Sequence, residues 1–471
     1  MNKKKILLLS DDLRMSSGIG TMSKEFVLGT VQHYDWVQVG GAIKHPEGGK
    51  VVNMDESIQK ETGVTDAKLT IYPVDGYGNG DILRQIMSIE KPDAILHYTD
   101  PRFWRWLYEM EHEIRQEMPI FYYNIWDDWP APHYNEWFYE SCDLIMNISK
   151  QTVAIVKDVW KKHPPEDWQV TYFPHGVNSE FYPITVFDDE YEKVQNMRKQ
   201  LTDDDVEFIF FYNNRNIRRK MPGDIILAFK TFCDTLSEEE AQKCALLMHT
   251  QPRDENGTDL PEVASTLCPE LKVYFSDKKV EPNQLNWLYN MADVTINIAS
   301  NEGFGLGTCE SLMAGTPIIV NITGGLQDQC GFKLKKYAPD RTGFTEVLLT
   351  ADDYCEIKSL HDDRKWKDNP DLTWGEWVKP VWPSNRALVG SIPTPYIFDD
   401  RCRFDDVAVA MKEWYEMDSD KRKECGMKGN QYVNDEEVMM TGKMMSQNFI
   451  DHMDKGFEMW KPRKRYSIFK A

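Results

Sequence analysis

Short apolar runs alternate with amphipathic helical segments along most of this 471-residue chain, and this alternation constrains the fold more than any other feature. Strand–helix alternation specifies a parallel sheet covered by helices on both faces. The runs form two series, separated by the polar, acidic stretch 188–205. We therefore expect an α/β fold with two successive doubly wound, Rossmann-like domains, in which ligands bind beyond the carboxyl ends of the strands. The expected strands are 6–10, 37–42, 69–74, 94–98, 120–125, 144–148 and 170–173 in the first series, and 208–212, 245–249, 273–275, 294–299 and 318–321 in the second.

The same pattern gives the expected domain boundaries. An N-terminal domain covers 1–187, a linker 188–205 and a C-terminal domain 206–435, followed by a terminal segment 436–471. Plausible helices of the first domain are 81–90, 103–115 and 152–161. Within the C-terminal domain, 330–397 has little periodicity and is rich in Trp, Pro and Asp, which indicates a functional insertion. In the terminal segment, apolar residues recur at helical spacing, which favours core packing of its methionines.

Charge and targeting signals limit the partners and the compartment. The chain has 55 basic and 76 acidic residues, a net charge of −21, so most of its surface repels nucleic acid and anionic lipid. A basic tail contains Lys461, Arg463, Lys464, Arg465 and Lys470 and is either a solvated terminus or a local anion-binding patch. The nine cysteines show no paired spacing, and no apolar stretch resembles a signal peptide or a membrane span. We expect a cytoplasmic protein.

A glycine-rich turn between a strand and a helix is the most informative stretch, with the sequence N-I-A-S-N-E-G-F-G-L-G-T-C-E-S-L-M-A-G-T-P-I-I-V over 297–320. The free N–H groups and dipole of a helix start suit a diphosphate, and small residues let the backbone approach it closely. Glu302 and Glu310 are carboxylates in a place that favours anions, so we expect hydroxyl-rich partners for them, namely the donor sugar and a ribose. The alternative is a helix capped by Glu302, with Glu310 as a surface acid. The other residues expected around the ligand that carries the diphosphate, the donor, are Gly303, Phe304, Gly305, Leu306 and Thr308.

Cations gather directly after the strand expected at 208–212. They are Arg215, Arg218, Arg219 and Lys220. Such a run is usually only a solvated face. Four cations within six residues at the carboxyl end of a strand, in so acidic a chain, favour a role in neutralising a leaving diphosphate.

Together, the two stretches resemble the retaining GT-B glycosyltransferases, the large family that includes sucrose and glycogen synthases. In that family an Arg and a Lys five positions apart hold the donor phosphates, and Arg215 and Lys220 match that spacing. The family's Glu-x7-Glu motif matches Glu302 and Glu310. The resemblance implies that Glu302 lies near the donor sugar and that Glu310 binds the ribose. It also implies a GT-B fold, with two domains facing each other across a cleft and the C-terminal helix packing back on the N-terminal domain.

Other elements extend the resemblance. Ser17-Gly18-Ile19-Gly20 looks like the family's glycine-rich loop near the donor, which assigns Gly18 and Gly20 to donor binding. The stretch 174–178, followed by Phe181, looks like the family element before the linker, and Gly324-Gly325 looks like a further turn of the family. His175 replaces the usual Asn of that element and is expected to be a hydrogen-bonded loop residue.

The first domain departs from the family at one position. Where the family has a His near the donor sugar, this chain has Trp126, in Ile125-Trp126-Asp127-Asp128. Trp126 and His97 are therefore candidates for acceptor contact, although a lone His at a strand end is more often structural. Asp127 either orients an acceptor hydroxyl as part of catalysis or caps a helix.

The resemblance implies transfer of a sugar from a nucleotide diphosphate sugar with retention of configuration, and the donor is expected to be a UDP-sugar. No metal is expected, because Arg215, Lys220 and a helix dipole supply the positive field. Three alternatives stay open: a nucleotide-sugar epimerase or hydrolase, a non-catalytic sugar-nucleotide binder, and a Rossmann dehydrogenase built on 17–20, which lacks a full G-x-G-x-x-G.

The acceptor is expected to be a glycan or a modified DNA base. The tryptophans of the insertion are candidates for its recognition, because aromatic faces stack on sugars and bases. A compact chain without a membrane helix resembles phage-encoded glycosyltransferases, some of which glycosylate hydroxymethylated bases that must leave the DNA stack. The net charge of −21 counts against a DNA substrate.

Overall fold

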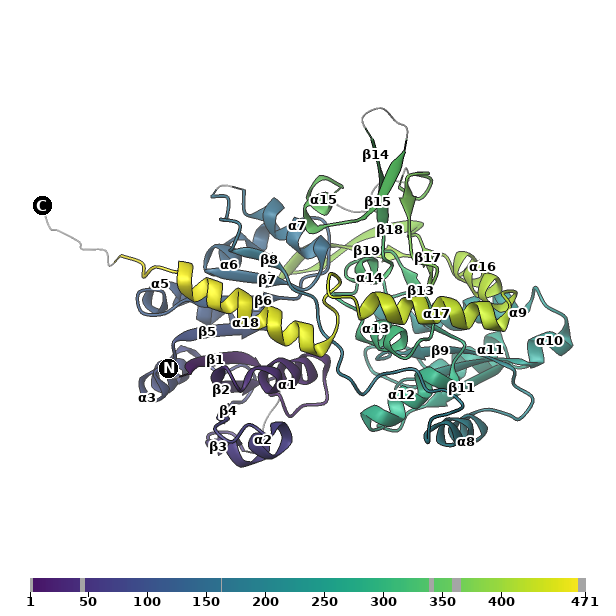
Figure 1. Ribbon diagram of the computed structural model, residues 1–471, viewed down its shortest axis with the longest axis horizontal. Helices are drawn as coiled ribbons and strands as arrows, with labels where there is room; N and C mark the ends of the chain where they lie inside the picture. Colours follow the sequence, from purple (N-terminus) through teal and green to yellow (C-terminus); the bar gives the residue numbers. More distant parts are fainter. Residues whose placement is uncertain (1–2, 43–46, 162, 339–342, 358–365, 465–471) are drawn as a thin grey trace, which may run out of the picture. The chain divides into compact units, whose positions relative to one another are not determined.

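The computed structural model describes residues 3–42, 47–161, 163–338, 343–357 and 366–464 and divides into two compact units (Figure 1). The first unit consists of Met1–Gly176, Ser391–Pro395 and Gly442–Ala471, and the second of Val177–Gly390 and Tyr396–Thr441. The division after Gly176 precedes the boundary expected at 187. Each unit contains a sheet of mainly parallel strands with helices between them, as the strand–helix alternation predicts.

The sheet of the first unit has the order β3-β4-β2-β1-β5-β6-β7-β8. All neighbouring strands are parallel except β3 and β4. Its central strand β1 carries four consecutive residues, Ile6 to Leu9, with 0% exposure, because helices cover both faces of a parallel sheet. The strands are β1 (Lys4–Asp11), β2 (Tyr34–Gly41), β3 (Val52–Asn53), β4 (Leu69–Pro73), β5 (Ala94–Tyr98), β6 (Ile120–Asn124), β7 (Leu144–Asn147) and β8 (Val170–Tyr172).

The helices of this unit follow the expected positions with one exception. The stretch 103–115, expected to be one helix, is divided into a 3-10 turn and two short helices, η1, α4 and α5. Its start is fixed earlier than expected, because the Asp100 side chain accepts from the Arg102 N–H and Pro101 occupies the first helical position. The helical elements are α1 (Gly18–Thr30), α2 (Asp55–Thr62), α3 (Gly80–Glu90), η1 (Pro101–Trp104), α4 (Arg105–Glu109), α5 (Glu111–Ile114), η2 (His133–Asn135), α6 (Glu136–Glu140) and α7 (Lys150–Val159).

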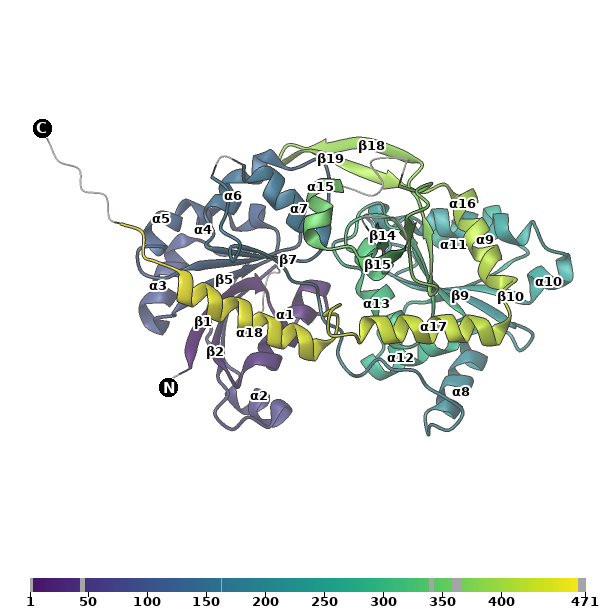
Figure 2. The ribbon, with the colours of Figure 1, turned by 45° about the horizontal axis from the view of Figure 1, so that its top comes forward.

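The last helix of the chain, α18 (Gly442–Met459), belongs to the first unit and packs beside α1 (Figure 2). The Phe449 ring stacks on Phe26 with centroids 5.1 Å apart, and the Tyr34 hydroxyl donates to Asp454 at 2.8 Å. Met445 and Met453 are buried in this contact. The expected packing of the terminal helix on the N-terminal domain is therefore confirmed, and Met445 and Met453 are core residues.

The sheet of the second unit has the order β11-β10-β9-β12-β13-β17, and all its pairs are parallel. Strands β9 and β12 are neighbours, so the segments that follow them leave the same edge of the sheet side by side. The strands are β9 (Phe208–Asn213), β10 (Cys244–His249), β11 (Lys272–Ser276), β12 (Val294–Asn297), β13 (Ile318–Asn321) and β17 (Val378–Val381). The helical elements are α8 (Tyr191–Leu201), η3 (Arg218–Lys220), α9 (Pro222–Cys233), α10 (Glu238–Gln242), α11 (Leu260–Leu267), α12 (Pro282–Met291), α13 (Leu306–Met313), α14 (Leu326–Gln329), α15 (Ala351–Ile357), α16 (Phe404–Tyr415) and α17 (Ser419–Val433).

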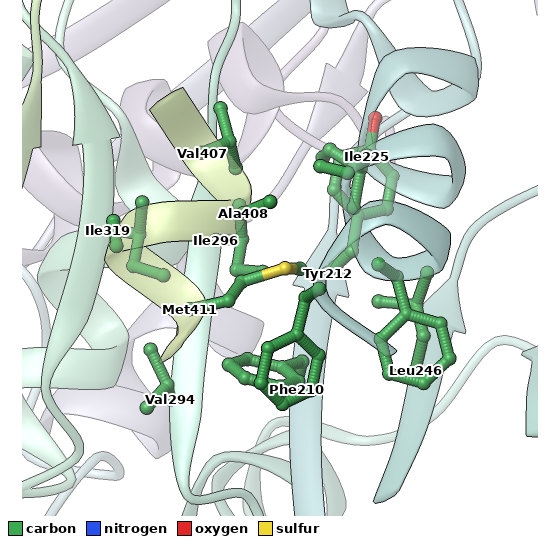
Figure 3. Close-up of a cluster of buried hydrophobic side chains, with 14 of the residues drawn as sticks. Phe210, Tyr212, Ile225, Leu246, Val294, Ile296, Ile319, Val407, Ala408 and Met411 are labelled. Carbon is green, nitrogen blue, oxygen red and sulfur yellow. The ribbon is translucent and has the colours of Figure 1, made fainter. Parts of the chain in front are cut away.

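The core of the second unit lies between this sheet and two helices, α9 and α16 (Figure 3). Phe210, Ile296 and Ile319 point from neighbouring strands toward Met411 of α16, and all four have 0% exposure. Burial of large apolar side chains contributes about 1.5–3 kcal/mol each, so this cluster holds β9 and β12 in place beneath the loops that follow them.

The segment 188–205 is not a free linker. It contains α8, which packs on α12. The Arg198 guanidinium fixes it by donating to the Met291 carbonyl at 3.0 Å and the Val206 carbonyl at 3.1 Å.

The segment expected to be an insertion adds strands that belong to the second unit, apart from Ser391–Pro395, which belong to the first. Besides β17, it forms a three-stranded antiparallel sheet and a two-stranded sheet. Its additional strands are β14 (Lys333–Tyr337), β15 (Phe344–Leu348), β16 (Leu372–Thr373), β18 (Asn385–Ser391) and β19 (Thr394–Arg401).

Two tryptophans of this segment are structural rather than open to an acceptor. Trp377 stacks on Tyr432 at 4.7 Å and donates its indole N–H to the Gln329 carbonyl at 2.9 Å. Trp382 is buried, whereas Trp374 is 40% exposed. No helix in the described parts of the chain is both long and apolar enough to cross a membrane.

Candidate functional site

The loops after β9 and β12 meet through a buried ion pair. The Lys220 Nζ donates to the Glu302 carboxylate, and both side chains are buried. Lys220 ends the turn η3 after β9, and Glu302 lies between β12 and α13. The structure thus brings together the cationic stretch and the glycine-rich stretch that the sequence singled out.

The charge on Glu302 is stabilised by its neighbours. Burial by itself would raise the pKa of this carboxyl group, but Lys220 and Arg219 outweigh it, and a 3.4 Å hydrogen bond from the Asn297 side chain adds to their effect. The pKa of Glu302 is therefore held below its usual range. Glu302 is an ionised group next to a cation and a weak acceptor for a further proton.

Main-chain contacts reinforce the same junction. The Arg219 guanidinium donates to the Asn301 carbonyl at 2.7 Å, and the Ser300 N–H donates to the Arg219 carbonyl at 2.7 Å. The Asn301 side chain in turn donates to the Phe398 carbonyl of β19 at 2.6 Å. The loop that carries Glu302 is thus fixed on two sides.

The other two cations of the stretch lie outside this junction. Arg215 is 63% exposed and donates from Nε to Asp254 at 2.9 Å, and Arg218 is 70% exposed and pairs with Asp399 at 3.4 Å. Only Lys220 and Arg219 contact the glycine-rich loop through the bonds described above. A role of Arg215 and Arg218 at a diphosphate stays a prediction.

Helix α13 begins without a side-chain cap. Its first residue follows Gly305, which has a φ of 89° and makes no capping hydrogen bond through a side chain. The Thr308 and Cys309 N–H groups both donate to the Gly305 carbonyl at 3.2 Å, so the N–H groups of Leu306 and Gly307 precede the hydrogen-bonded part of the helix. Glu302 does not cap the helix, because its carboxylate is paired with Lys220. A helix start of this kind attracts anions.

Residues that follow β13 hold the glycine-rich stretch in place through hydrogen bonds to its carbonyl groups. The Gly325 N–H donates to the Glu302 carbonyl at 2.9 Å, and the Gln329 side chain donates to the carbonyls of Phe304 and Gly305 at 2.8 and 3.0 Å. Gly324 has a φ of 49°, and a Cβ at this position would overlap the Glu302 carbonyl oxygen. Glycine is needed here for close backbone approach.

Glu310 lies on α13 in a chain of hydrogen bonds that starts at the end of β9. The Asn213 side chain donates to the Tyr289 hydroxyl at 2.7 Å, and this hydroxyl donates to the Glu310 carboxylate at 2.7 Å. Burial raises the pKa of Glu310 to about 7, although the bond from Tyr289 opposes the shift. Glu310 is only partly exposed, so it is not the surface acid of the alternative interpretation.

In the first unit, Gly18 and Gly20 do not form a loop but occupy the first turn of α1, at the carboxyl end of β1. The Ser17 Oγ caps this helix by accepting from the Gly20 N–H at 3.0 Å. A Cβ on Gly20 would lie 2.5 Å from the Met15 carbonyl oxygen, which explains a glycine at this position.

Trp126 and Asp127 lie in a segment after β6 that is neither helix nor strand. The next helical element, η2, begins at His133 and has Pro132 at its N-cap position, so Asp127 is not a helix cap. The Trp126 indole N–H donates to the Asp128 carbonyl at 2.7 Å, and its ring lies 5.9 Å from the ring of Tyr134. Trp126 is 9% exposed. The Asp127 carbonyl accepts from the Gln151 side chain at 2.9 Å.

His97 is a core residue, and the expectation that it contacts an acceptor is corrected. It has 0% exposure, stacks on Tyr122 with centroids 5.1 Å apart and bonds through Nδ1 to the Tyr108 hydroxyl at 2.7 Å. Burial lowers its pKa to about 3, so the ring is neutral. His175 is hydrogen-bonded to the Tyr123 hydroxyl at 2.5 Å, as expected for a structural loop residue.

Comparison with known proteins identifies the fold. No protein-family model matches the chain. By sequence, the chain is 27% identical over 208 residues to the uncharacterized glycosyltransferase MJ1607 of Methanocaldococcus jannaschii, over 43% of this chain and 48% of that protein. The match thus spans about half the length of this curated relative.

Solved structures are similar over almost the whole chain. They include sucrose-phosphate synthase of Thermosynechococcus elongatus, with a TM-score of 0.63, 14% identity and coverage of 97% of this chain and 100% of that one. Anabaena HepE in complex with UDP and glucose has a TM-score of 0.61 and 10% identity, over 96% of this chain and 100% of that one. A UDP-forming trehalose-phosphate synthase of Burkholderia xenovorans has a TM-score of 0.61 and 12% identity, over 97% and 100%. The chain has the GT-B glycosyltransferase fold.

In this GT-B chain, the sequence located the two central loops but missed the residues that support them. Tyr289, Asn213 and Gln329 are polar side chains within ordinary helices or at a strand end, and their roles depend on contacts distant in sequence. In the part of the chain that the structure describes, no group of three or more His, Cys, Asp or Glu side chains is placed to hold a metal ion. The basic tail is described only through Lys464, and Arg463 pairs with Glu111 at 3.4 Å.

Proposed function

We propose that this GT-B protein is a retaining glycosyltransferase that moves a sugar from a nucleotide diphosphate sugar, in the first place a UDP-sugar, to an acceptor hydroxyl. The observation that carries the proposal is the Lys220–Glu302 contact, which joins the two motif-bearing loops at one edge of the second sheet. The structural neighbours whose names include UDP support this type of donor.

The donor diphosphate is assigned to the start of α13. The N–H groups of Leu306 and Gly307 and the helix dipole favour an anion there, and Lys220 and Arg219 lie beside the preceding loop. Arg215 joins them when its exposed side chain exchanges Asp254 for a phosphate, an exchange that costs little because exposed ion pairs contribute only about 0–1 kcal/mol.

We assign Glu310 to binding of the nucleoside and place the donor sugar near Glu302. A carboxylate whose position is fixed by Tyr289 can accept hydrogen bonds from both ribose hydroxyls. Gly303, Phe304 and Thr308 line the same loop and helix start. A donor-binding role of Gly18 and Gly20, at the start of α1, is proposed from the resemblance of their motif. Asp127 and Trp126 are assigned to the acceptor side.

Retention is proposed because the spacing of Arg215 and Lys220 and of Glu302 and Glu310 resembles that of retaining GT-B enzymes, and the charge on Glu302 is consistent with it. An inverting transferase needs a general base that removes the proton of the acceptor hydroxyl. Glu302 is a poor base, because Lys220 and Arg219 hold its pKa below the usual range. In the proposed mechanism the bond from the anomeric carbon to the leaving phosphate breaks, and the acceptor oxygen forms its bond on the same face. The acceptor proton passes to the leaving phosphate, whose negative charge the cations stabilise.

Product analysis tests the function. The protein is incubated with UDP-glucose and related UDP-sugars, with and without a panel of hydroxylated acceptors, and the products are examined by NMR. We expect acceptor-dependent release of UDP and an α-linked product from an α-linked donor. Donor interconversion without an acceptor would identify an epimerase, and donor binding without turnover on any acceptor would identify a binding protein.

A further inference from the structure

Two aromatic rings form a shelf at the carboxyl edge of the first unit's sheet. Tyr77, in the loop after β4, stacks on Phe103 of η1, with ring centroids 4.8 Å apart and planes at 6°. Phe103 is 53% exposed, although a large apolar side chain is usually buried. Trp104 is fully buried and meets the Tyr77 ring edge-on at 5.4 Å. The aromatic shelf, defined as Tyr77 and Phe103, is therefore a rigid surface.

Carboxylates lie beside the aromatic shelf. Asp11 is paired with Gly41 of β2, and a Cβ on Gly41 would lie 3.2 Å from the Tyr77 ring, while Asp100 caps η1, the turn that carries Phe103. Burial, with a smaller contribution from the charges of Asp11 and Asp100, raises the pKa of the Tyr77 hydroxyl to about 12. Asp11 ends β1 and is partly buried, and no described residue donates a hydrogen bond to its carboxylate. Its carboxylate oxygens are thus available to accept hydrogen bonds from the hydroxyl or N–H groups of a ligand.

The cation of this edge is already neutralised. The Arg102 guanidinium donates from Nε to both Asp100 oxygens, at 2.8 and 3.0 Å. The same guanidinium lies over the Trp126 ring, 5.9 Å from its centroid. Among these residues, the edge therefore offers the exposed Phe103 ring and carboxylates but no unpaired positive charge.

We propose that the aromatic shelf binds a sugar ring of a neutral, hydroxyl-rich acceptor, such as an uncharged glycan, with Asp11 accepting a hydrogen bond from one of its hydroxyls. This inference rests on the proposed transferase function, because it names the class of acceptor. Stacking on C–H-rich sugar faces uses the exposed aromatic surface, and carboxylates bind hydroxyls but repel phosphate. Phosphorylated sugars and DNA are disfavoured for the same electrostatic reason.

A glycan array with neutral, phosphorylated and sulfated glycans tests the inference on the full-length labelled chain, with and without UDP. The variant Phe103→Ala is compared with Phe344→Ala, which removes a phenylalanine of nearly equal exposure, 52%, from β15 of the second unit. Thermal melting confirms that both variants are folded. We expect the wild type and Phe344→Ala to bind neutral glycans, and Phe103→Ala to bind them about tenfold more weakly.

UDP binding, measured by calorimetry on the same three proteins, separates this inference from the proposed function. Equal UDP affinity together with loss of neutral-glycan binding in Phe103→Ala supports both. If UDP does not bind but Phe103→Ala still weakens neutral-glycan binding, the donor assignment is wrong and the inference about the aromatic shelf is supported. Equal glycan binding by the two variants, absence of neutral-glycan binding, or a preference for anionic glycans or a hydroxymethylcytosine duplex overturns the inference.

Discussion

The ammonium group of Lys220 donates to the buried carboxylate of Glu302 and so ties the loop after β9 to the loop after β12. The two residues are far apart in sequence, but their loops follow neighbouring parallel strands. We propose that this pair positions Lys220 to neutralise the leaving diphosphate and keeps Glu302 ionised during transfer.

The first prediction concerns this ion pair. Lys220→Met leaves the Glu302 charge buried without its partner, and breaking a buried pair costs about 3–5 kcal/mol of unfolding free energy. The double variant Lys220→Met/Glu302→Leu removes both charges and should recover most of that stability, but its turnover should stay at least about 10²-fold below the wild type. Urea unfolding and initial rates measure both quantities. Full activity in the stable double variant would show that the pair is only structural.

A second prediction compares two exposed arginines. Arg215→Ala should lower kcat/KM for the donor by about 10²-fold, because a phosphate contact is lost as charge develops. Arg253 is 69% exposed and pairs with Asp259 at 2.7 Å, so it closely resembles Arg215, which is 63% exposed. Arg253→Ala should change the same ratio less than twofold. Equal losses in the two variants would assign the Arg215 effect to general surface charge.

A third prediction follows from the pKa of Glu310. Because burial raises this pKa to about 7 in the folded protein, ionisation of Glu310 costs stability as pH rises above the unfolded value of 4.5, and the full cost is present above about 7. Glu310→Gln removes the cost. Its unfolding free energy should exceed that of the wild type by about 1–3 kcal/mol at pH 8, with no difference near pH 4. UDP affinity should fall in the variant. A stability difference that is independent of pH would contradict the assignment.

A fourth prediction separates a positioning role of Tyr289 from simple packing. Tyr289→Phe removes the hydrogen bond that lowers the pKa of Glu310, so the pH at which UDP binding becomes half-maximal should move upward. Calorimetric titrations between pH 5 and 9 measure this midpoint. A packing defect alone would weaken binding without moving the midpoint.

A fifth prediction concerns the turn under the glycine-rich loop. In Gly324→Ala the new Cβ would overlap the Glu302 carbonyl at a φ of 49°, so we expect a loss of more than about 2 kcal/mol of unfolding free energy and impaired turnover. Gly223→Ala is the matched control, because nothing lies within 4 Å of its Cβ position in the first turn of α9. It should be neutral or stabilise the protein by up to about 1 kcal/mol.

Much of the sheet was predictable because buried parallel strands are continuous apolar runs. The run 94–98 coincides with β5, and the runs before the two central loops mark β9 and β12. Most residues of α8 are polar or charged and Val194 is the only buried one, so the stretch lacks the apolar periodicity that predicts a packed helix. The strands β14, β15 and β18 were missed for a similar reason, since their residues are largely exposed.

The residues of the site likewise divide into those with a local sequence signal and those whose role depends on contacts distant in sequence. Glycine-rich turns and clustered charges are local signals, so the loops around Lys220 and Glu302 were found. Tyr289 and Gln329 act on residues brought near them by the fold, and the exposed pairing of Arg215 with Asp254 depends on a loop after a different strand. The spacing of residues along the chain does not predict such contacts.

The most direct test of the central claim is the affinity for UDP relative to uridine, measured by calorimetry on the wild type and on Lys220→Met/Glu302→Leu. If the loops after β9 and β12 form one diphosphate site, the wild type should bind UDP about a hundredfold more tightly than uridine, and the double variant should lose most of this preference. A wild type that binds the two ligands equally, or a double variant with the full preference, would contradict the account.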